Sequence, residues 1–261
     1  MPILNPGPQQ IAYALSGPAD APVIVLSNSL GTTMAMWDAQ VEVLARDFRV
    51  LRYDTRGHGD SGLGDSPATG YTLEQLGGDV LRLLDALDIG RAHFCGISMG
   101  GLTGLWLGVH AGQRLLSLTV ANSAPCIGTA TGWRDRAGQV AATGMGPIAD
   151  GAPTRWFSAA FVQRSPSVVA GLIDGLRHSP PDGYAACCMA LAKADLRARI
   201  GAIAVPTLLL AGRFDPVTTV DDAQFMRARI KDARLEVLDA SHLSNVEAAQ
   251  DFTARLHEFV R

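Results

Sequence analysis

One short segment has the residue types and the spacing that nucleophilic catalysis needs. Residues 96–100 read G-I-S-M-G and match the G-x-S-x-G pattern around a reactive serine. A strand-like run, residues 92–95, precedes the segment, and a helix-like run, residues 102–110, follows it. A sharp strand–turn–helix would place the Ser98 hydroxyl at a helix N-terminus, where developing negative charge is favoured. We therefore predict that Ser98 is a nucleophile; the alternative is a serine in a purely structural turn.

His242 is placed to act as the general base that a serine nucleophile needs. It follows the last predicted strand, residues 235–238, and precedes the last predicted helix, at the edge where sites of open α/β sheets gather. The alternative is a surface or helix-capping histidine. The other histidines are less well placed: His58 lies in an early turn and His93 at the start of a strand. His110 and His257 lie within helices, and His178 lies in the long segment of helical pattern at about 124–204.

Asp215 is the predicted acid, because it lies in the loop after a predicted strand at residues 207–211 and completes the chain order Ser, Asp, His. It would fix the tautomer of His242 and stabilise the imidazolium without taking a proton. Asp239 competes for this role, but it is too near His242 in sequence to reach around to the ring nitrogen. The alternative for Asp215 is an ordinary turn aspartate beside Pro216.

Two backbone N–H groups should stabilise the oxyanion that forms in acyl transfer. We predict that one belongs to Met99, the residue after the nucleophile. The other would come from the loop after an early strand at residues 23–27, and Leu30 is our choice there. The alternative is an ordinary strand-to-helix turn, which would have the same sequence as this loop.

The elements that must position these groups alternate between short apolar runs and helical patterns. Several runs are apolar on both faces, as strands covered by helices on each side must be. Capping boxes at residues 72–75 and 244–247 would open two of the helices. The alternation predicts an α/β fold with a mostly parallel, doubly wound sheet. The predicted strands are residues 11–14, 23–27, 50–53, 93–96, 116–121, 207–211 and 235–238.

Residues 124–204 break this alternation, because they contain no convincing strand. An all-helical insert between two strands predicts a lid over the carboxyl edge of the sheet. We therefore predict a single domain, residues 1–261, with a core of 1–123 and 205–261 and a helical lid at about 124–204. The helix-like pieces, which Gly and Pro separate, are residues 133–143, 154–163, 167–177 and 184–192.

Composition argues against several classes of protein. Hydrophobic residues make up 48% and charged residues 18% of the chain, as in globular proteins. The net charge of −3, without a basic stripe, argues against nucleic-acid binding. No apolar run is long enough to span a bilayer, and the start of the chain lacks the features of a secretory signal. We expect a cytoplasmic protein without a membrane partner; the sequence does not indicate an oligomeric state.

The cysteines lack the spacing of a metal site, and Cys187 and Cys188 are adjacent. We expect these two, together with Cys95 and Cys126, to be free and largely buried thiols in a reducing compartment. The sequence predicts no metal and no cofactor.

Residues 53–61, 96–101, 212–215 and 241–242 together resemble the α/β-hydrolase superfamily. More narrowly, the chain resembles the 3-oxoadipate enol-lactonases of bacterial aromatic-acid breakdown through the β-ketoadipate route. Many superfamily members have His-Gly where this chain has Asn28 and Ser29, and that departure favours the lactonases over generic esterases. The segments that carry the narrower resemblance are residues 27–32, 37–38, 132–134 and 241–247.

The resemblance implies an α/β-hydrolase fold, with the helical lid inserted before the last two strands, and an enzyme that opens 3-oxoadipate enol-lactone to 3-oxoadipate. Ser98 would attack the lactone carbonyl while His242 takes its proton. The enolate would leave while still tethered through the acyl chain, and water activated by His242 would release the product. This chemistry needs neither a metal nor an organic cofactor.

The implied substrate is a small anion, and a carboxylate in an apolar pocket favours an arginine partner. Arg134 is our first choice for that partner, with Trp133, Trp156 and Met145 as the apolar wall. A solvated helix face and plain lid packing are the alternatives for these side chains. The other arginines of the predicted lid are Arg136, Arg155, Arg164 and Arg177.

Residues 54–61 contain Asp, Arg, His and Ser and could be mistaken for a second catalytic cluster. Their glycine spacing is typical of a structured turn after a strand, and we predict a structural role for this segment.

Other functions on the same scaffold stay open. A carboxylesterase, a hydrolase of carbon–carbon bonds in ring-cleavage products, or a perhydrolase would use the same three side chains. An arginine that faces the pocket would favour the lactonase. A receptor-like ligand-binding protein is a further alternative, which multiple turnovers on an activated ester would exclude.

Overall fold

The computed structural model describes residues 2–4, 10–64 and 70–261. Within these residues, eight strands form one sheet in the order β1-β2-β4-β3-β5-β6-β7-β8. The pairs β1–β2 and β2–β4 are antiparallel, and every other pair is parallel. The strands are β1 Ile3–Leu4, β2 Ile11–Ser16, β3 Val23–Ser27, β4 Arg49–Tyr53, β5 Ala92–Ile97, β6 Leu115–Ala121, β7 Thr207–Gly212 and β8 Ala233–Leu238.

The predicted α/β fold with a mostly parallel sheet is therefore confirmed. All seven predicted strands are present, and their ends differ from the prediction by no more than two residues. The two-residue strand β1 was not predicted, because it is too short to show an alternating pattern.

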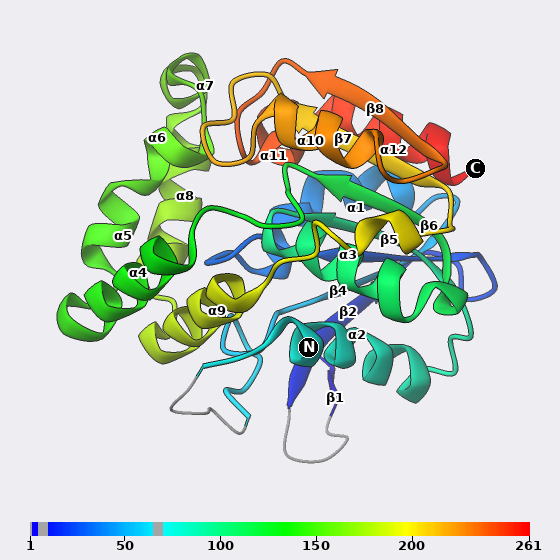
Figure 1. The fold of residues 1–261 in the computed structure, drawn as a ribbon, viewed down its shortest axis with the longest axis horizontal. Helices are drawn as coiled ribbons and strands as arrows, with labels where there is room; N and C mark the ends of the chain where they lie inside the picture. Colours follow the sequence, from blue (N-terminus) through cyan, green and yellow to red (C-terminus); the bar gives the residue numbers. More distant parts are fainter. Residues whose placement is uncertain (1, 5–9, 65–69) are drawn as a thin grey trace.

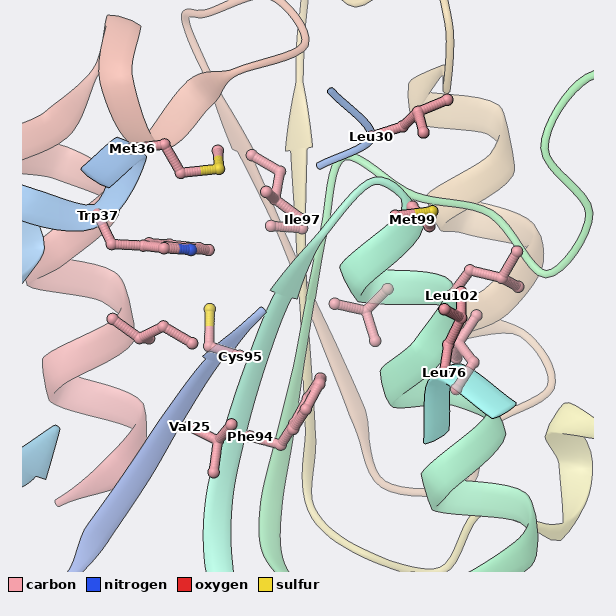
Figure 2. Packing of buried hydrophobic residues seen from close by; sticks show 14 of the residues in the cluster. Val25, Leu30, Met36, Trp37, Leu76, Phe94, Cys95, Ile97, Met99 and Leu102 are labelled. Atoms are coloured by element: carbon pink, nitrogen blue, oxygen red, sulfur yellow. The ribbon is translucent and has the colours of Figure 1, made fainter. Parts of the chain in front are cut away.

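Helices cover both faces of the sheet (Figure 1). Figure 2 shows β5 between two layers: Cys95 lies on the side of Trp37, and Phe94 packs against Gly104 on the other side. Both faces of this strand are buried, which explains its continuous apolar sequence. The core helices are α1 Asp38–Leu44, α2 Leu73–Ala86, α3 Met99–His110, α10 Val220–Arg227, α11 Ser244–Glu247 and α12 Ala249–Val260, with the 3-10 turns η1 Met34–Trp37, η2 Gly112–Arg114 and η3 Ile200–Ala202.

The first predicted capping box is confirmed, because the Thr72 side chain accepts from Gln75 N–H and the Gln75 side chain accepts from Thr72 N–H. The second is wrong. The N-cap of α11 is Leu243, and the Ser244 hydroxyl donates to Asn122 instead of capping the helix. The Glu247 carboxylate accepts from Ser241, outside the helix.

Between β6 and β7 the structure describes every residue, and six helices and no strand lie there, apart from the short turn η3. They gather at one side of the sheet (Figure 1). The predicted helix at residues 154–163 is broken at Phe157, whose backbone is extended, and Ser158 caps the helix that follows. No helix of the described residues is long and apolar enough to cross a membrane. The helices between β6 and β7, called the lid helices below after the prediction, are α4 Ala130–Thr143, α5 Gly146–Asp150, α6 Ala152–Trp156, α7 Ala159–Arg164, α8 Pro166–Arg177 and α9 Pro181–Lys193.

Candidate active site

Ser98 sits on a strained turn between β5 and α3. Its φ is +56°, a conformation that non-glycine residues rarely adopt and that is retained mainly at functional sites. The turn is tight enough to require glycine on both sides. A Cβ at Gly96 would lie 2.1 Å from the Gly100 carbonyl oxygen, and one at Gly100 would lie 2.3 Å from the Ser27 carbonyl oxygen. The Ser123 hydroxyl donates to the Ser98 carbonyl at 2.7 Å and fixes the turn from the side of β6.

The structure brings Ser98, His242 and Asp215 together, although Ser98 and His242 are 144 residues apart in sequence. His242 Nε2 lies 2.9 Å from Ser98 Oγ, and His242 Nδ1 lies 2.8 Å from Asp215 Oδ2. All three are buried. With its proton on Nδ1, the ring donates to the carboxylate and presents Nε2 as acceptor to the serine hydroxyl. This is the geometry of a nucleophile whose proton can be removed.

Asp215 is held ionised by a dense set of donors. Burial raises the pKa of its carboxyl, but the charge of His242 and hydrogen bonds from His242, Asn122 and the Val217 N–H outweigh burial and lower the pKa below its ordinary value. Oδ1 accepts from the Val217 and Thr218 N–H groups at 2.7 and 3.1 Å. Oδ2 accepts from Asn122 Nδ2 at 3.0 Å and the Thr218 hydroxyl at 2.8 Å. Asp215 is therefore an anion that can stabilise an imidazolium.

Asp239, the competing carboxylate, lies outside this cluster. Its side chain is exposed and pairs with Arg213 at 2.6 Å.

Asn122 is a site residue that the sequence analysis missed. Its amide donates to Asp215 and, at 3.1 Å, to the Ser241 carbonyl, while its oxygen accepts from the Ser244 hydroxyl. It thus ties the acid loop to the loop that carries His242. The only signal in the sequence was its place, directly after a strand at the carboxyl edge of the sheet.

Leu30 and Met99, the predicted oxyanion donors, both lie beyond the carboxyl end of β5 (Figure 2). Met99 is the first residue of α3, where an N–H has no acceptor within the helix. Leu30 lines the same cavity as Ser98. Its N–H has no hydrogen-bond partner among the described residues.

The loop that carries Leu30 is clamped from two sides. Asn28 donates to the Tyr53 carbonyl at 2.9 Å and accepts from the Trp37 indole at 2.9 Å. His58 Nε2 accepts from the Gly31 N–H at 3.1 Å. Burial lowers the pKa of His58 to about 4, which keeps its ring neutral and able to accept. Through these contacts, the Asn28–Trp37 pair and His58 of the segment 54–61 fix the position of the backbone around Leu30.

A cavity of about 350 Å³ opens above Ser98 and His242. Pro216 and Val217 of the acid loop and Ser29 and Leu30 form part of its wall. Helices between β6 and β7 form much of the rest, through Trp133, Arg136, Arg155, Trp156, Leu176 and Tyr184. Two predicted wall residues, Trp133 and Trp156, therefore face the cavity, whereas Met145 is buried elsewhere in the core.

The structure corrects the choice of arginine. Arg134 is exposed on α4 and is not part of the cavity wall, whereas Arg136 and Arg155 are. Arg134 and Arg136 are two positions apart on one helix and so point in nearly opposite directions. Burial, followed by the charge of Arg136, lowers the pKa of Arg155. Arg164 packs over Phe161 and Arg177 pairs with Asp150, both outside the cavity.

Two like charges in one partly buried cavity repel each other, and an anion between them would relieve that repulsion. The Arg136 guanidinium also lies 5.0 Å from the centre of the Trp133 ring, which holds it against the apolar wall. The cavity can therefore accept a small molecule that combines an apolar body with a carboxylate.

Glu247 connects the lid helices to the His242 loop. Its carboxylate accepts from the Ser241 N–H at 3.0 Å and from both the N–H and the hydroxyl of Ser158. The Leu243 N–H donates to the Trp156 carbonyl at 3.0 Å. Residues on both sides of His242 are thus fixed to the start of α7 and the end of α6. Sequence reasoning missed this role, because it assigned Glu247 to a local capping box.

The described residues hold no cluster of His, Cys, Asp or Glu that could bind a metal ion. The cysteines are free; Cys187 and Cys188 are fully buried in α9 and do not line the cavity. Burial raises the pKa of Cys188 to about 12, so its thiol is un-ionised at neutral pH.

Comparisons of the sequence and of the structure with known proteins indicate the same family. Residues 22–155 match the model of the alpha/beta hydrolase fold. The chain is 47% identical to 3-oxoadipate enol-lactonase 1 of Acinetobacter baylyi over 99% of this chain and 96% of that protein. It is 49% identical to 3-oxoadipate enol-lactonase 2 of the same organism, over 92% and 89%. The enol-lactonase structure from Burkholderia xenovorans is 43% identical, with a TM-score of 0.96 over 99% of both chains.

Proposed function

The chain belongs to the α/β-hydrolase family and, within it, to the group of the 3-oxoadipate enol-lactonases, and on this premise we propose that it opens 3-oxoadipate enol-lactone to 3-oxoadipate. The observation that carries the proposal is the cavity that has the Ser98–His242 pair at its base and Arg136 and Arg155 in its wall. The reaction would belong to bacterial aromatic-compound breakdown through the β-ketoadipate pathway. A cytoplasmic location stays a prediction.

Catalysis begins with the attack of Ser98 Oγ on the lactone carbonyl carbon, while His242 Nε2 takes the hydroxyl proton. The negative charge that forms on the carbonyl oxygen is met by the N–H groups of Leu30 and Met99. Asp215 stabilises the imidazolium and keeps the ring in place.

Collapse of the tetrahedral intermediate breaks the ring C–O bond and leaves an acyl-enzyme on Ser98. The departing oxygen is an enolate, which is a better leaving group than an alkoxide, and it stays attached through the acyl chain. It takes up the proton that the His242 imidazolium received from Ser98 and becomes the ketone, which returns His242 to its neutral form. Water, deprotonated by His242, then attacks the ester carbonyl, and Ser98 recovers its proton as 3-oxoadipate leaves. The net reaction consumes one water per lactone.

Arg136 and Arg155 take the role that the sequence analysis gave to Arg134. The acetate arm of the lactone carries a carboxylate, and a guanidinium binds a carboxylate through paired, charge-assisted hydrogen bonds. The apolar faces of Trp133 and Trp156 would hold the ring. The arginines together with this apolar wall would favour binding of an anionic lactone over a neutral ester of similar size.

A substrate panel tests the proposal. Steady-state hydrolysis is measured on freshly generated 3-oxoadipate enol-lactone, on neutral p-nitrophenyl acetate and on a carbon–carbon ring-cleavage product. We expect kcat/KM of roughly 10⁵ M⁻¹s⁻¹ or more on the lactone and a much lower value on the other two. Good turnover of the ester with poor turnover of the lactone would contradict the proposal and favour a carboxylesterase.

A further inference from the structure

A second cavity, larger than the catalytic one, lies directly behind part of the catalytic cavity's wall. Its volume is about 560 Å³. The two cavities have no lining residue in common, but residues of the same elements line both. In the loop after β3, Leu30 faces the catalytic cavity and Gly31 faces the second one. On α8, Leu176 faces the catalytic cavity, and Leu172 and Gly175 face the second. The same loop and the same helix therefore separate them.

The partition consists of the Leu176 side chain packed on the Gly31 backbone. A Cβ built at Gly31 would lie 2.4 Å from Leu176 Cδ1 and 3.1 Å from the Tyr184 ring, so the leucine and the tyrosine rest directly against this residue. Gly31 also has a φ of +80°, which favours glycine for a second reason. Leu176 lines the catalytic cavity but is only 1% exposed, because its side chain is packed closely between the two cavities.

We propose that Leu176 determines substrate length by closing the catalytic cavity against the second cavity, which would otherwise take the apolar tail of a longer ester or lactone. This inference rests on the proposed function, because it assumes that Ser98 turns over carboxylic esters. The occupant of the second cavity would be an unbranched alkyl chain, since Met36, Phe161, Val168, Leu172 and Val246 contribute to its lining.

Truncation of Leu176 should join the two cavities. We expect Leu176→Ala to raise the ratio of kcat/KM for octanoate to that for acetate, measured on p-nitrophenyl esters, by about tenfold or more. Because either half of an ester could point toward the partition, octyl acetate against ethyl acetate is measured in parallel. The gain is expected in one of the two series.

The chain offers two matched controls on the same helix. Val169 is buried in α8 but lines neither cavity, so Val169→Ala should leave both ratios unchanged. Gly175 lines the second cavity and has no neighbouring atom within 4 Å of a built Cβ, so Gly175→Leu fits there and fills the space. Gly175→Leu added to Leu176→Ala should abolish the gain. Melting temperatures report whether each variant folds.

If Leu176→Ala does not fold, Leu176→Val is the second variant, with a smaller gain in the same direction. Unchanged ratios in folded Leu176→Ala or Leu176→Val, or a gain that Gly175→Leu does not reverse, would overturn the proposal. A wild-type chain that fails to hydrolyse 3-oxoadipate enol-lactone would instead overturn the proposed function. Normal lactone turnover by the wild type, with no gain on the longer esters in folded Leu176→Ala, would contradict the partition alone.

Discussion

The carboxylate of Glu247 accepts a hydrogen bond from the N–H of Ser241, the residue before His242, at 3.0 Å. Because the same carboxylate binds Ser158 at the start of α7, the position of the histidine loop depends on the lid helices. A histidine displaced by a fraction of an ångström would meet Ser98 at a poorer angle.

Glu247→Ala should therefore lower kcat by about ten- to a hundredfold on both the lactone and a neutral ester, with KM changed little. Steady-state kinetics on both substrates test this expectation. Glu258→Ala removes an exposed carboxylate of α12 and serves as the control. An effect on KM alone would argue against a positioning role for Glu247.

His242→Ala and Asp215→Asn should each be nearly inactive yet folded. For Asp215→Asn we expect a loss in kcat of about 10⁴-fold, because the imidazole loses the partner that fixes its tautomer and stabilises its charge. Thermal unfolding checks that each variant is folded. Asp239→Asn changes a carboxylate that pairs with Arg213 on the surface and should keep wild-type activity. Most activity retained in His242→Ala would rule out His242 as the base.

Arg136→Ala and Arg155→Ala should each raise KM for the anionic lactone by about ten- to a hundredfold, the cost of one charge-assisted hydrogen bond. The KM of a neutral ester should change far less. Arg134→Ala, on the exposed face of the same helix as Arg136, should change neither value. Equal effects of the two cavity arginines on both substrates would show that they support the fold and not the substrate carboxylate.

His58 should make the protein less stable in mild acid. Its pKa is about 4 in the folded chain, against an ordinary 6.5, because burial disfavours the charged ring. Between these two values the unfolded chain binds a proton that the folded chain does not, so the free energy of unfolding falls as the pH drops from 6.5 to 4. The loss from this one group should be about 3 kcal/mol.

The check is denaturant unfolding of wild type and His58→Gln between pH 7 and pH 4. The glutamine side chain does not titrate, so the variant should lose about 3 kcal/mol less than the wild type over this range. His178→Gln, which removes an exposed histidine, should follow the wild-type curve. Parallel curves for wild type and His58→Gln would mean that His58 is not a neutral, buried acceptor.

Much of the fold could be predicted because its signals are local. The runs that became β3, β5 and β7 are apolar on both faces, as short strands buried between two helical layers are. The motif around Ser98 and the order of Asp215 and His242 could be found because each follows a strand.

The features that could not be predicted depend on contacts between distant segments. Asn122 and Glu247 reach partners up to 122 residues away, and their neighbours in the sequence do not indicate which residues these partners are. Which arginine of α4 enters the cavity depends on the rotation of that helix, which is set by its packing against α9. The sequence around Arg134 and Arg136 has no strong apolar stripe that would have shown this rotation.

The central claim is that Ser98, activated by His242, opens the lactone. The most direct test is kcat/KM on freshly generated 3-oxoadipate enol-lactone for the wild type and folded Ser98→Ala, side by side. We expect the wild type to reach roughly 10⁵ M⁻¹s⁻¹ and Ser98→Ala to lose several orders of magnitude. A Ser98→Ala protein that opens the lactone at a rate close to that of the wild type would contradict the nucleophilic mechanism.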